Sequence, residues 1–305
     1  MATFRATMPE LLETRLKRVY LNNYSRIPSL WEKIANIESS TQSHEDTIRV
    51  AGLGLLVLKP EGTPVTYDDP VQGTRKRAVH QTYALGFRVT MEMMDDEQYN
   101  VIEKMPADLA DATREHKEIL FWSIFNDAFA GSTFTDADGT TALCASHTLL
   151  RSGTAGSTFS NFLSPTVALS VSGLESIMTK FALTPNESGR YVQLRGQYLV
   201  IHPNESHKAY QLLETTKEPF TNENQENTVK TSRSGLTPLE TPYLTDTDAY
   251  FVVSPKSQHR MIWYNRMKVT FGRDKDAQTK DAMFDAMYRA SVTWDDWRGV
   301  VGSGA

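Results

Sequence analysis

The stretch TIRVAGLGLLVLKP at residues 47–60 is rich in aliphatic side chains and predicts a β-strand. A second run of this kind, RAVHQTYALGFRVTMEM, occupies residues 77–93. The connecting segment 61–76, EGTPVTYDDPVQGTRK, is dense in proline and glycine, which favour turns. Together they predict a long β-hairpin over residues 47–93. Strands of about 12 residues reach on the order of 40 Å, and an isolated ribbon of that length is only marginally stable in water, so it requires a partner surface.

Charged residues of both signs gather around the turn of this hairpin. Two acidic residues stand on one side of the turn and three basic residues on the other: Asp68, Asp69, Arg75, Lys76 and Arg77. A solvated turn explains such a cluster, and so does a set of salt bridges to neighbouring subunits. The sequence leaves both interpretations open.

The segment before the hairpin has the pattern of an arm with little core of its own. An amphipathic helix is predicted over roughly Pro9 to Asn22, with Leu12, Leu16 and Val19 on one face. A second short helix follows and carries Trp31 on its apolar side. Such an arm usually buries its apolar stripe on another surface. We expect a neighbouring chain to provide it.

A long helix is predicted after the hairpin. A short helix first covers Asp95 to Lys104, and Pro106 then suits the first turn of a helix that runs to about Ala130. Gly131 is a natural stop, and the helix would be roughly 35–40 Å long. Its second half is apolar almost all round, so we expect several other elements to cover it.

The remaining residues alternate between helical and strand patterns. A loop-rich region with two short strands is expected over residues 131–164, followed by a helix with Ser172 and Glu175 as its capping box. The other expected elements are a buried strand over 196–202, a helix opened by Pro203, an irregular polar segment over 216–238, and a terminal antiparallel hairpin built from 260–271 and 284–294.

Composition narrows the class of protein. The 305 residues are 40% hydrophobic and 23% charged, near the average for a globular protein. The net charge of −5 lacks the basic excess of a tight nucleic-acid binder, so any contact with DNA would be weak and local. No apolar run approaches the roughly 18 residues that span a bilayer, and the start of the chain does not resemble a signal peptide.

No group of residues predicts catalysis. Cys144 is the single cysteine, so it excludes an internal disulfide, and no base is evident beside it. Ser146 and His147 are adjacent in sequence, which points their side chains to opposite faces of a strand. A hydrolase that uses His147 or His202 is the distant alternative. We therefore predict no catalytic residues.

Cofactor and metal motifs are incomplete. Gly52 and Gly54 resemble the start of a dinucleotide fingerprint, but the third glycine and the following helix are missing. His202 and His207 are five residues apart, whereas zinc-binding helices space histidines four apart. Asp136 and Asp138 match only part of a calcium loop. We expect no cofactor and no metal.

The middle of the chain resembles a known family. DGTTALCASHTLLRSGTAGSTFSNFL (138–163), SGLESIMTKFAL (172–183) and ESGRYVQLRGQYLVIHPNESHKAYQLLETT (187–216) are similar to major capsid proteins of tailed bacteriophages, and most similar to Mu-like major head subunits. The positions that match that pattern are Asp138, Gly139, Leu143, Ser146, His147, Asn161, Leu199 to Pro203, Ala209, Leu212 and Leu213. The closing segment WDDWRGVVGSG (294–304) is also similar in type.

This resemblance implies an α+β chain with the Hong Kong 97-like capsid fold. It divides the chain into an N-terminal arm (1–46), an E-loop hairpin (47–93), a P-domain with its spine helix (94–135), an A-domain (136–250), and a terminal β-hairpin that returns to the P-domain (251–305). The arm and the hairpin would lack a core because their partners are other subunits. The side chains expected at those contacts are Leu12, Leu16, Val19, Trp31, Asp68, Asp69, Arg75, Lys76 and Arg77.

The resemblance also implies partners. The chain would form homo-pentamers and homo-hexamers of a phage head around double-stranded DNA, assembled in the bacterial cytoplasm, with a portal and in some cases a cement protein. The spine helix begins near residue 106, which leaves no room for an N-terminal scaffold segment, so a separate scaffolding protein is expected. A covalent cross-link through Lys59 or Lys76 is not expected. The nearest alternative is an encapsulin-type nanocompartment shell, and a tail or decoration protein is a further one.

Overall fold

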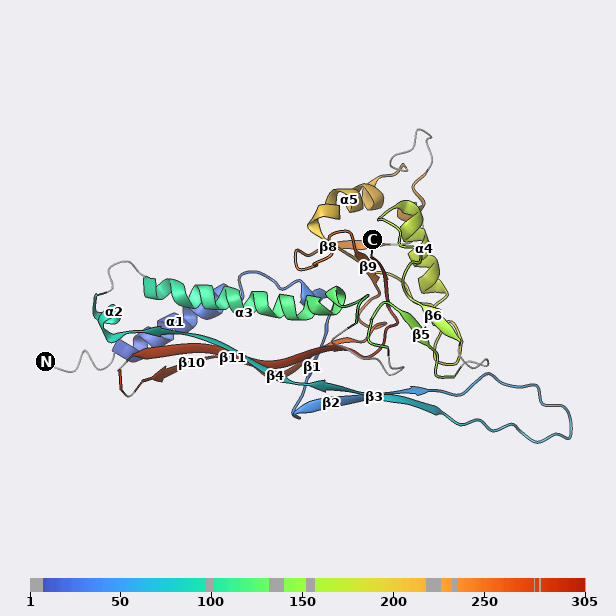
Figure 1. The fold of residues 1–305 in the computed structure, drawn as a ribbon, viewed down its shortest axis with the longest axis horizontal. Coiled ribbons are helices and arrows are strands. Elements are labelled where there is room, and N and C mark those ends of the chain that lie inside the picture. Colours follow the sequence, from blue (N-terminus) through green and yellow to red (C-terminus); the bar gives the residue numbers. More distant parts are fainter. Residues whose placement is uncertain are drawn as a thin grey trace.

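The computed structural model describes residues 8–96, 101–131, 140–151, 157–217, 226–231, 235–276, 278–279 and 281–304. Helices and strands are both well represented, and the molecule is built around two separate four-stranded sheets. The first, here called the long sheet, forms an elongated half of the molecule, and the second, the short sheet, forms a lobe at one end of it (Figure 1). The predicted α+β class is confirmed. No described helix is long and apolar enough to cross a membrane.

The long sheet has the strand order β1-β10-β11-β4. Its strands are β1 (Asn36–Ser39), β4 (Gln81–Val89), β10 (Met261–Lys275) and β11 (Ala282–Trp294). β10 and β11 form the predicted terminal hairpin, and most side chains of β11 alternate between buried and half-buried, as a period of two requires. β10 has register shifts near Met267, so its pairing with β11 is not continuous.

Two long helices lie together on one face of the long sheet (Figure 1). They are α1 (Met8–Tyr24) and α3 (Val101–Asn126), and the short helix α2 (Met91–Asp96) precedes α3. The expected start of the long helix at Pro106 is wrong, because α3 begins at Val101 and contains the proline. The expected end near Ala130 is also wrong, because α3 ends at Asn126 and a turn follows it as far as Gly131, which has φ +60 and donates its N–H to the Asp127 carbonyl at 2.8 Å.

The short sheet has the order β12-β9-β7-β8. One of its faces forms a core with the helices around it, and the other face packs in the same core as β10 and β11 of the long sheet. The strands are β7 (Tyr198–Ile201), β8 (Thr237–Glu240), β9 (Tyr250–Val253) and β12 (Val300–Ser303), and the helices around it are α4 (Val171–Ala182), α5 (Ser206–Glu214) and α6 (Thr228–Thr231). The expected helix cap at Ser172 is wrong, because the Ser170 hydroxyl accepts the Gly173 N–H at 3.1 Å.

The end of the chain returns to the short sheet. β12 pairs antiparallel with β9, which in turn pairs with β7. A domain boundary at residue 250 therefore falls within β9 of this sheet. The segment 251–305 contributes β10 and β11 to the long sheet, and most of β9 and all of β12 to the short sheet. Short one-turn helices, η1 (Trp31–Lys33) and η2 (Pro203–Glu205), and the two-stranded pair β5 (Ser146–Thr148) and β6 (Thr158–Ser160) complete the fold. The last pair confirms the two short strands expected there.

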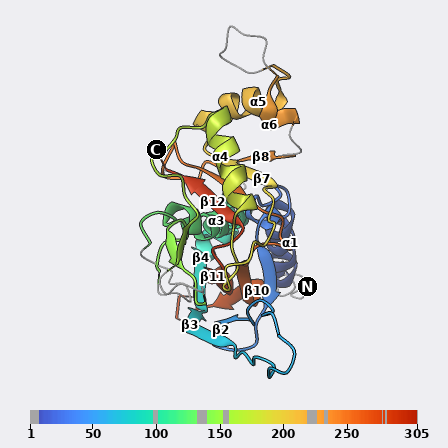
Figure 2. The same ribbon diagram turned by 90° about the vertical axis from the view of Figure 1, so that its right-hand side faces the viewer.

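The hairpin differs from its expected form. β2 (His44–Ala51) pairs with β3 (Val71–Val79), and after His80 the chain continues directly into β4 of the long sheet. Residues 52–70 contain no strand and form a long loop, here called the distal loop. In Figure 2 the two-stranded ribbon lies below the long sheet while α4 and α5 lie above it. In place of the strand expected over 47–60, the structure has the shorter β2. In place of the strand expected over 77–93, it has the end of β3 followed by β4.

Candidate interaction surfaces

The N-terminal arm is covered by its own chain. Leu16 is fully buried with residues of β4, α3 and β11, and Trp31 stacks on Trp263 of β10 at 4.4 Å between ring centroids. The expectation that Leu16 and Trp31 contact a neighbouring subunit is therefore wrong. An amphipathic stripe shows that a surface must be covered, but not which chain covers it. Val19 is half-buried, and the side chain of Leu12 lies outside the described part of the chain.

Two consecutive residues of α3 hold this arm in place. The Lys117 ammonium donates to the Tyr24 hydroxyl at 2.7 Å. The Glu118 carboxylate accepts from the backbone N–H groups of Leu30 at 2.7 Å and of Trp31 at 3.3 Å. Burial lowers the pKa of Lys117 to about 8 and raises the pKa of the Glu118 carboxyl. The arm is thus fixed by polar contacts that are largely withdrawn from water.

We expect replacement of Lys117 by Met to remove a pH dependence of stability. Between its folded pKa near 8 and its ordinary value of 10.5, Lys117 binds a proton more readily in the unfolded chain. Stability therefore rises with pH in this window, by about 2 kcal/mol from pH 7.5 to pH 9.5. Urea denaturation at both pH values measures the rise, which Lys117→Met should abolish. An exposed control, Lys17→Met, should retain it, and an unchanged rise in Lys117→Met would contradict the assignment.

The charged residues of the ribbon are paired within the chain. Asp46 of β2 accepts from Arg77 at 2.7 Å and lies 3.6 Å from Arg75. The Lys76 ammonium lies 3.9 Å from the centre of the Trp294 ring, and its residue is only 9% exposed. For Lys76, the expected contact with another subunit is therefore wrong, because burial within its own chain leaves almost no free surface. Arg75 and Arg77 remain largely exposed beside their intrachain partner.

The root of the ribbon is fastened through His80. Its two ring nitrogens lie 2.9 Å from the hydroxyls of Ser291 and Ser40, and the Ser40 hydroxyl donates to Glu45 at 2.5 Å. Because Ser40 donates to the carboxylate, it accepts from His80 Nε2–H, and Nδ1 then accepts from Ser291. The hydrogen bond between His80 and Ser40 therefore links the segment that connects β3 to β4 with the segment that connects β1 to β2.

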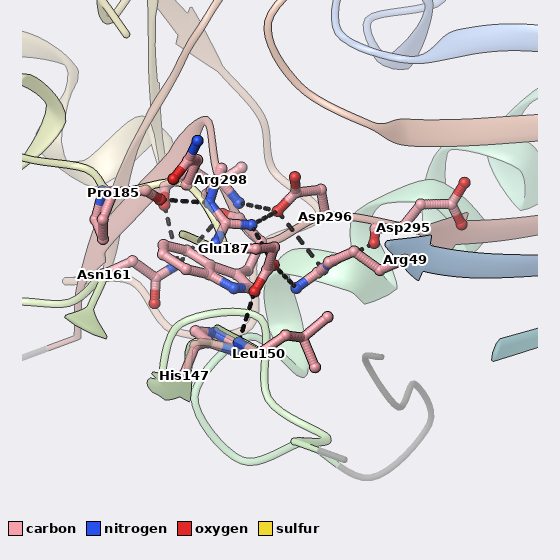
Figure 3. A network of polar contacts seen from close by, with 12 residues as sticks. Arg49, His147, Leu150, Asn161, Pro185, Glu187, Asp295, Asp296 and Arg298 are labelled. Carbon is pink, nitrogen blue, oxygen red and sulfur yellow. Dashed lines mark hydrogen bonds and ion pairs between the residues drawn. The ribbon is translucent and has the colours of Figure 1, made fainter. Parts of the chain in front are cut away.

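A buried ion-pair network joins the ribbon to the short-sheet lobe (Figure 3). Glu187 Oε1 accepts from Arg49 at 3.0 Å and from Arg298 at 2.9 Å, and Oε2 accepts from the Leu150 N–H at 2.9 Å. Arg298 also donates to the Pro185 carbonyl and pairs with Asp296 at 3.0 Å. The side chains of Arg49, Glu187 and Arg298 are at most 10% exposed. Sequence reasoning missed this network, since its members come from three distant segments.

The distal loop presents the largest run of exposed apolar side chains in the described residues. Leu55, Leu56, Val57 and Leu58 are 74%, 102%, 70% and 89% exposed, and Tyr67 is 91% exposed. Contiguous apolar surface of this kind marks a site of interaction with another macromolecule. Asp68 and Asp69, at the end of the same loop, contact Arg151 of their own chain. The Asp68 carboxylate thus has an intrachain partner and is still 36% exposed, so the expected contact with another subunit stays a prediction.

The residues considered for enzymatic chemistry have structural partners. His147 is fully buried, stacks on Trp297 at 4.7 Å, and its Nε2–H donates to the Leu143 carbonyl at 3.1 Å. Cys144 is buried as well, and burial raises the pKa of its thiol. His202 accepts the Asn204 N–H and caps the η2 turn. In the part of the chain that the structure describes, no group of three potential metal ligands occurs, while Asp136 and Asp138 lie outside it.

His259 predicts a loss of stability in acid. It is 2% exposed, and burial together with the nearby Lys256 lowers its pKa to about 4. Since the unfolded chain binds this proton near pH 6.5, stability falls as pH drops from about 6.5 to 4, by about 2 kcal/mol between pH 7 and pH 5. His259→Asn keeps an acceptor for the Met261 N–H and should lose correspondingly less over that interval in urea denaturation. The exposed control His207→Gln should follow the wild type, and identical slopes for all three proteins would refute the assignment.

The fold is shared with shell-forming proteins of known structure. The capsid of an empty GTA particle is 12% identical with a TM-score of 0.58, and each chain is covered to 92%. The capsid of the cyanophage P-SCSP1u is 12% identical with a TM-score of 0.57, over 91% of this chain and 88% of the other. A virus-like particle from Pyrococcus furiosus is 9% identical with a TM-score of 0.51, over 95% and 98%. The chain thus has the Hong Kong 97-like capsid fold.

Its family follows from the sequence comparison. The family model described as phage capsid protein matches residues 74–303. This range is well over half of the chain, which therefore belongs to the phage capsid protein family. No curated protein sequence matches significantly. The protein is a structural major capsid protein, a component of the virion that assembles with copies of itself, and not an enzyme.

Proposed function

We propose that this chain forms pentamers and hexamers of an icosahedral phage head that encloses double-stranded DNA. The observation that carries the proposal is the distal loop, which exposes four consecutive aliphatic side chains at residues 55–58 on a chain with a capsid fold. A protein that stays monomeric gains nothing from such a surface, whereas a shell subunit buries it against a neighbour. The net charge of −5 supports only weak and nonspecific contact with the packaged DNA.

The domains are assigned in the same terms. The long sheet with α3 corresponds to a P-domain, the short-sheet lobe to an A-domain, the ribbon with its distal loop to the E-loop, and residues 1–46 to the N-terminal arm. The charged candidates that keep enough exposed surface to contact another subunit are Arg75 and Arg77 of the ribbon and Asp68 and Asp69 of the distal loop. Leu12 and Val19 remain candidates in the arm.

The resemblance of the central segments to Mu-like head subunits supplies the finer identity. On that basis the shell assembles in the bacterial cytoplasm with a separate scaffolding protein and a portal, and a cement protein is a further candidate partner. Co-expression with the neighbouring reading frames of the source genome tests these partners. A scaffold is required if closed, uniform shells form only in co-expression, and it is dispensable if they form without it.

Negative-stain electron microscopy of the purified recombinant protein, with sedimentation velocity alongside, tests the proposal. Closed shells, or rings and tubes with five-fold and six-fold capsomers, are the expected result. A compact monomer at high protein concentration, in a sample that still unfolds cooperatively, would contradict it. Because folding is checked independently, a failure to assemble is not confused with a failure to fold.

A nanocompartment shell that holds a protein cargo is the second candidate. The observation in its favour is the similarity in fold to the virus-like particle from Pyrococcus furiosus, over 98% of that chain. The two candidates differ in content. Nuclease-protected DNA in particles purified from the native source supports the phage head, whereas a single abundant internal protein and no DNA supports the compartment.

A further inference from the structure

The distal loop is held at its base by one side chain of the short-sheet lobe. Arg151 Nη1 donates to the carbonyls of Gly52 at 3.2 Å and Asp69 at 2.8 Å, and its Nη2 forms an ion pair with the Asp68 carboxylate. Gly52 begins the loop and Asp69 lies near its end, so a single guanidinium ties the two legs together. The Asp68 carboxylate also accepts the Gly54 N–H at 2.8 Å, which closes the base from the other side.

The loop that follows α4 adds weaker contacts on one leg. The Ser188 hydroxyl donates to the Gly52 carbonyl at 3.3 Å, and Arg190 donates to the Leu53 carbonyl at 3.3 Å. All of these contacts stop at Gly54 on the first leg and begin at Asp68 on the second. The apolar residues 55–58 lie beyond them and are exposed. The base of the distal loop is therefore held by hydrogen bonds and an ion pair, whereas the side chains of residues 55–58 are exposed.

Burial separates this grip from the ion-pair network beneath it. The side chains of Arg49 and Glu187 are 10% and 9% exposed, whereas those of Arg151 and Asp68 are 24% and 36% exposed. Dissolved salt weakens exposed ion pairs far more than buried ones. The outer grip should therefore open under conditions in which the inner network still holds the ribbon.

The backbone at the base permits such an opening. A Cβ atom built on Gly52 would meet no heavy atom within 4 Å, so this residue has open space around it and no side chain to restrict its rotation. Ala51, the preceding residue, is fully buried at the end of β2. A fixed residue is thus followed at once by a conformationally permissive one, which is the arrangement of a hinge.

We infer that Arg151 is a releasable clamp on the distal loop, which holds the loop in one orientation against its own subunit and lets it swing about Gly52 when the clamp opens. The inference rests on the proposed function for its purpose: a shell subunit occupies several environments, so its contact loop needs more than one orientation. The ribbon does not move in this device, because Arg49, Glu187 and Arg298 fix it separately.

Hydrogen–deuterium exchange measured by mass spectrometry tests the clamp without reference to shell formation. In Arg151→Gln, peptides that cover residues 52–58 should gain deuterium faster at Gly54, by about tenfold for that amide, since its N–H donates to the Asp68 carboxylate that Arg151 holds in place. Peptides that cover β2 should not change. Arg195→Gln, which alters an exposed arginine of the same lobe with no side-chain contact shown among the described residues, should match the wild type.

A second variant and a salt series keep the test decisive. Asp68→Asn removes only the ion pair and should give a smaller increase in the same peptides, and 1 M NaCl should reproduce that increase in the wild type. Unchanged exchange of residues 52–58 in both variants would overturn the clamp. Faster exchange in β2 to the same degree would also overturn it, because the ribbon and the loop would then open together. Neither outcome bears on whether the chain forms shells, which microscopy of the same samples reports separately.

Discussion

Replacement of Glu187 by Gln is expected to lower the free energy of unfolding by about 3 kcal/mol, because it leaves two buried guanidinium groups with only the half-buried Asp296 as a countercharge. Glu187 is the shared acceptor of Arg49 and Arg298, and both arginines are at most 10% exposed. An amide retains the shape but not the charge. Urea denaturation at fixed protein concentration measures the change, since subunit association also contributes to apparent stability.

A graded set of variants separates this effect from a general weakening. Glu92→Gln, an exposed carboxylate of α2, should change stability by less than about 0.5 kcal/mol. A triple variant that replaces Arg49, Glu187 and Arg298 by Met, Leu and Met removes all three charges at once. It should cost less than Glu187→Gln alone, since the charge left without its arginine partners is then that of Asp296, whose side chain is 30% exposed to water. A loss below about 1 kcal/mol for Glu187→Gln would mean that water enters the network and that it does not fix the ribbon.

The network also shows where sequence reasoning ended. Strand alternation predicts β10 and β11 because each has one buried face, and glycine chemistry predicts the positive φ of Gly131, which closes the turn after α3. The short sheet was harder to recognise, since its strands are four residues each and too short for a periodic pattern. The approach of Arg49, Glu187 and Arg298 depends on tertiary folding alone. No spacing along the chain encodes it.

The errors on the proposed contact residues have one physical origin. An amphipathic helix such as α1 indicates that one face must be buried, and a charge cluster indicates that countercharges are needed. Neither pattern indicates whether the partner lies in the same chain or in another one. Leu16, Trp31 and Lys76 all find their partners within the same subunit. Among the described residues, the longest apolar run without such cover is that of the leucines and valine at 55–58. Its aliphatic sequence predicts a strand, whereas the structure has an exposed loop at these residues.

The double replacement of Leu56 and Leu58 by Ser is expected to block assembly while leaving the subunit folded. These side chains are 102% and 89% exposed, so they contribute almost nothing to the stability of a single chain. Burial of a leucine against a neighbour contributes about 1.5–3 kcal/mol, so loss of both should raise the critical concentration for assembly at least about a hundredfold. Light scattering over a concentration series measures this value.

The control for that experiment lies in the same loop. Thr66→Ser removes one methyl group from another exposed residue of the distal loop and should assemble at nearly the wild-type concentration. Urea denaturation should give equal unfolding free energies for all three chains under non-assembling conditions. If the double leucine variant assembles like the wild type, the distal loop lies outside the subunit interfaces and its apolar run needs another partner. If it assembles poorly and unfolds normally, then Leu56 and Leu58 stabilise contacts between subunits and not the fold of the single subunit.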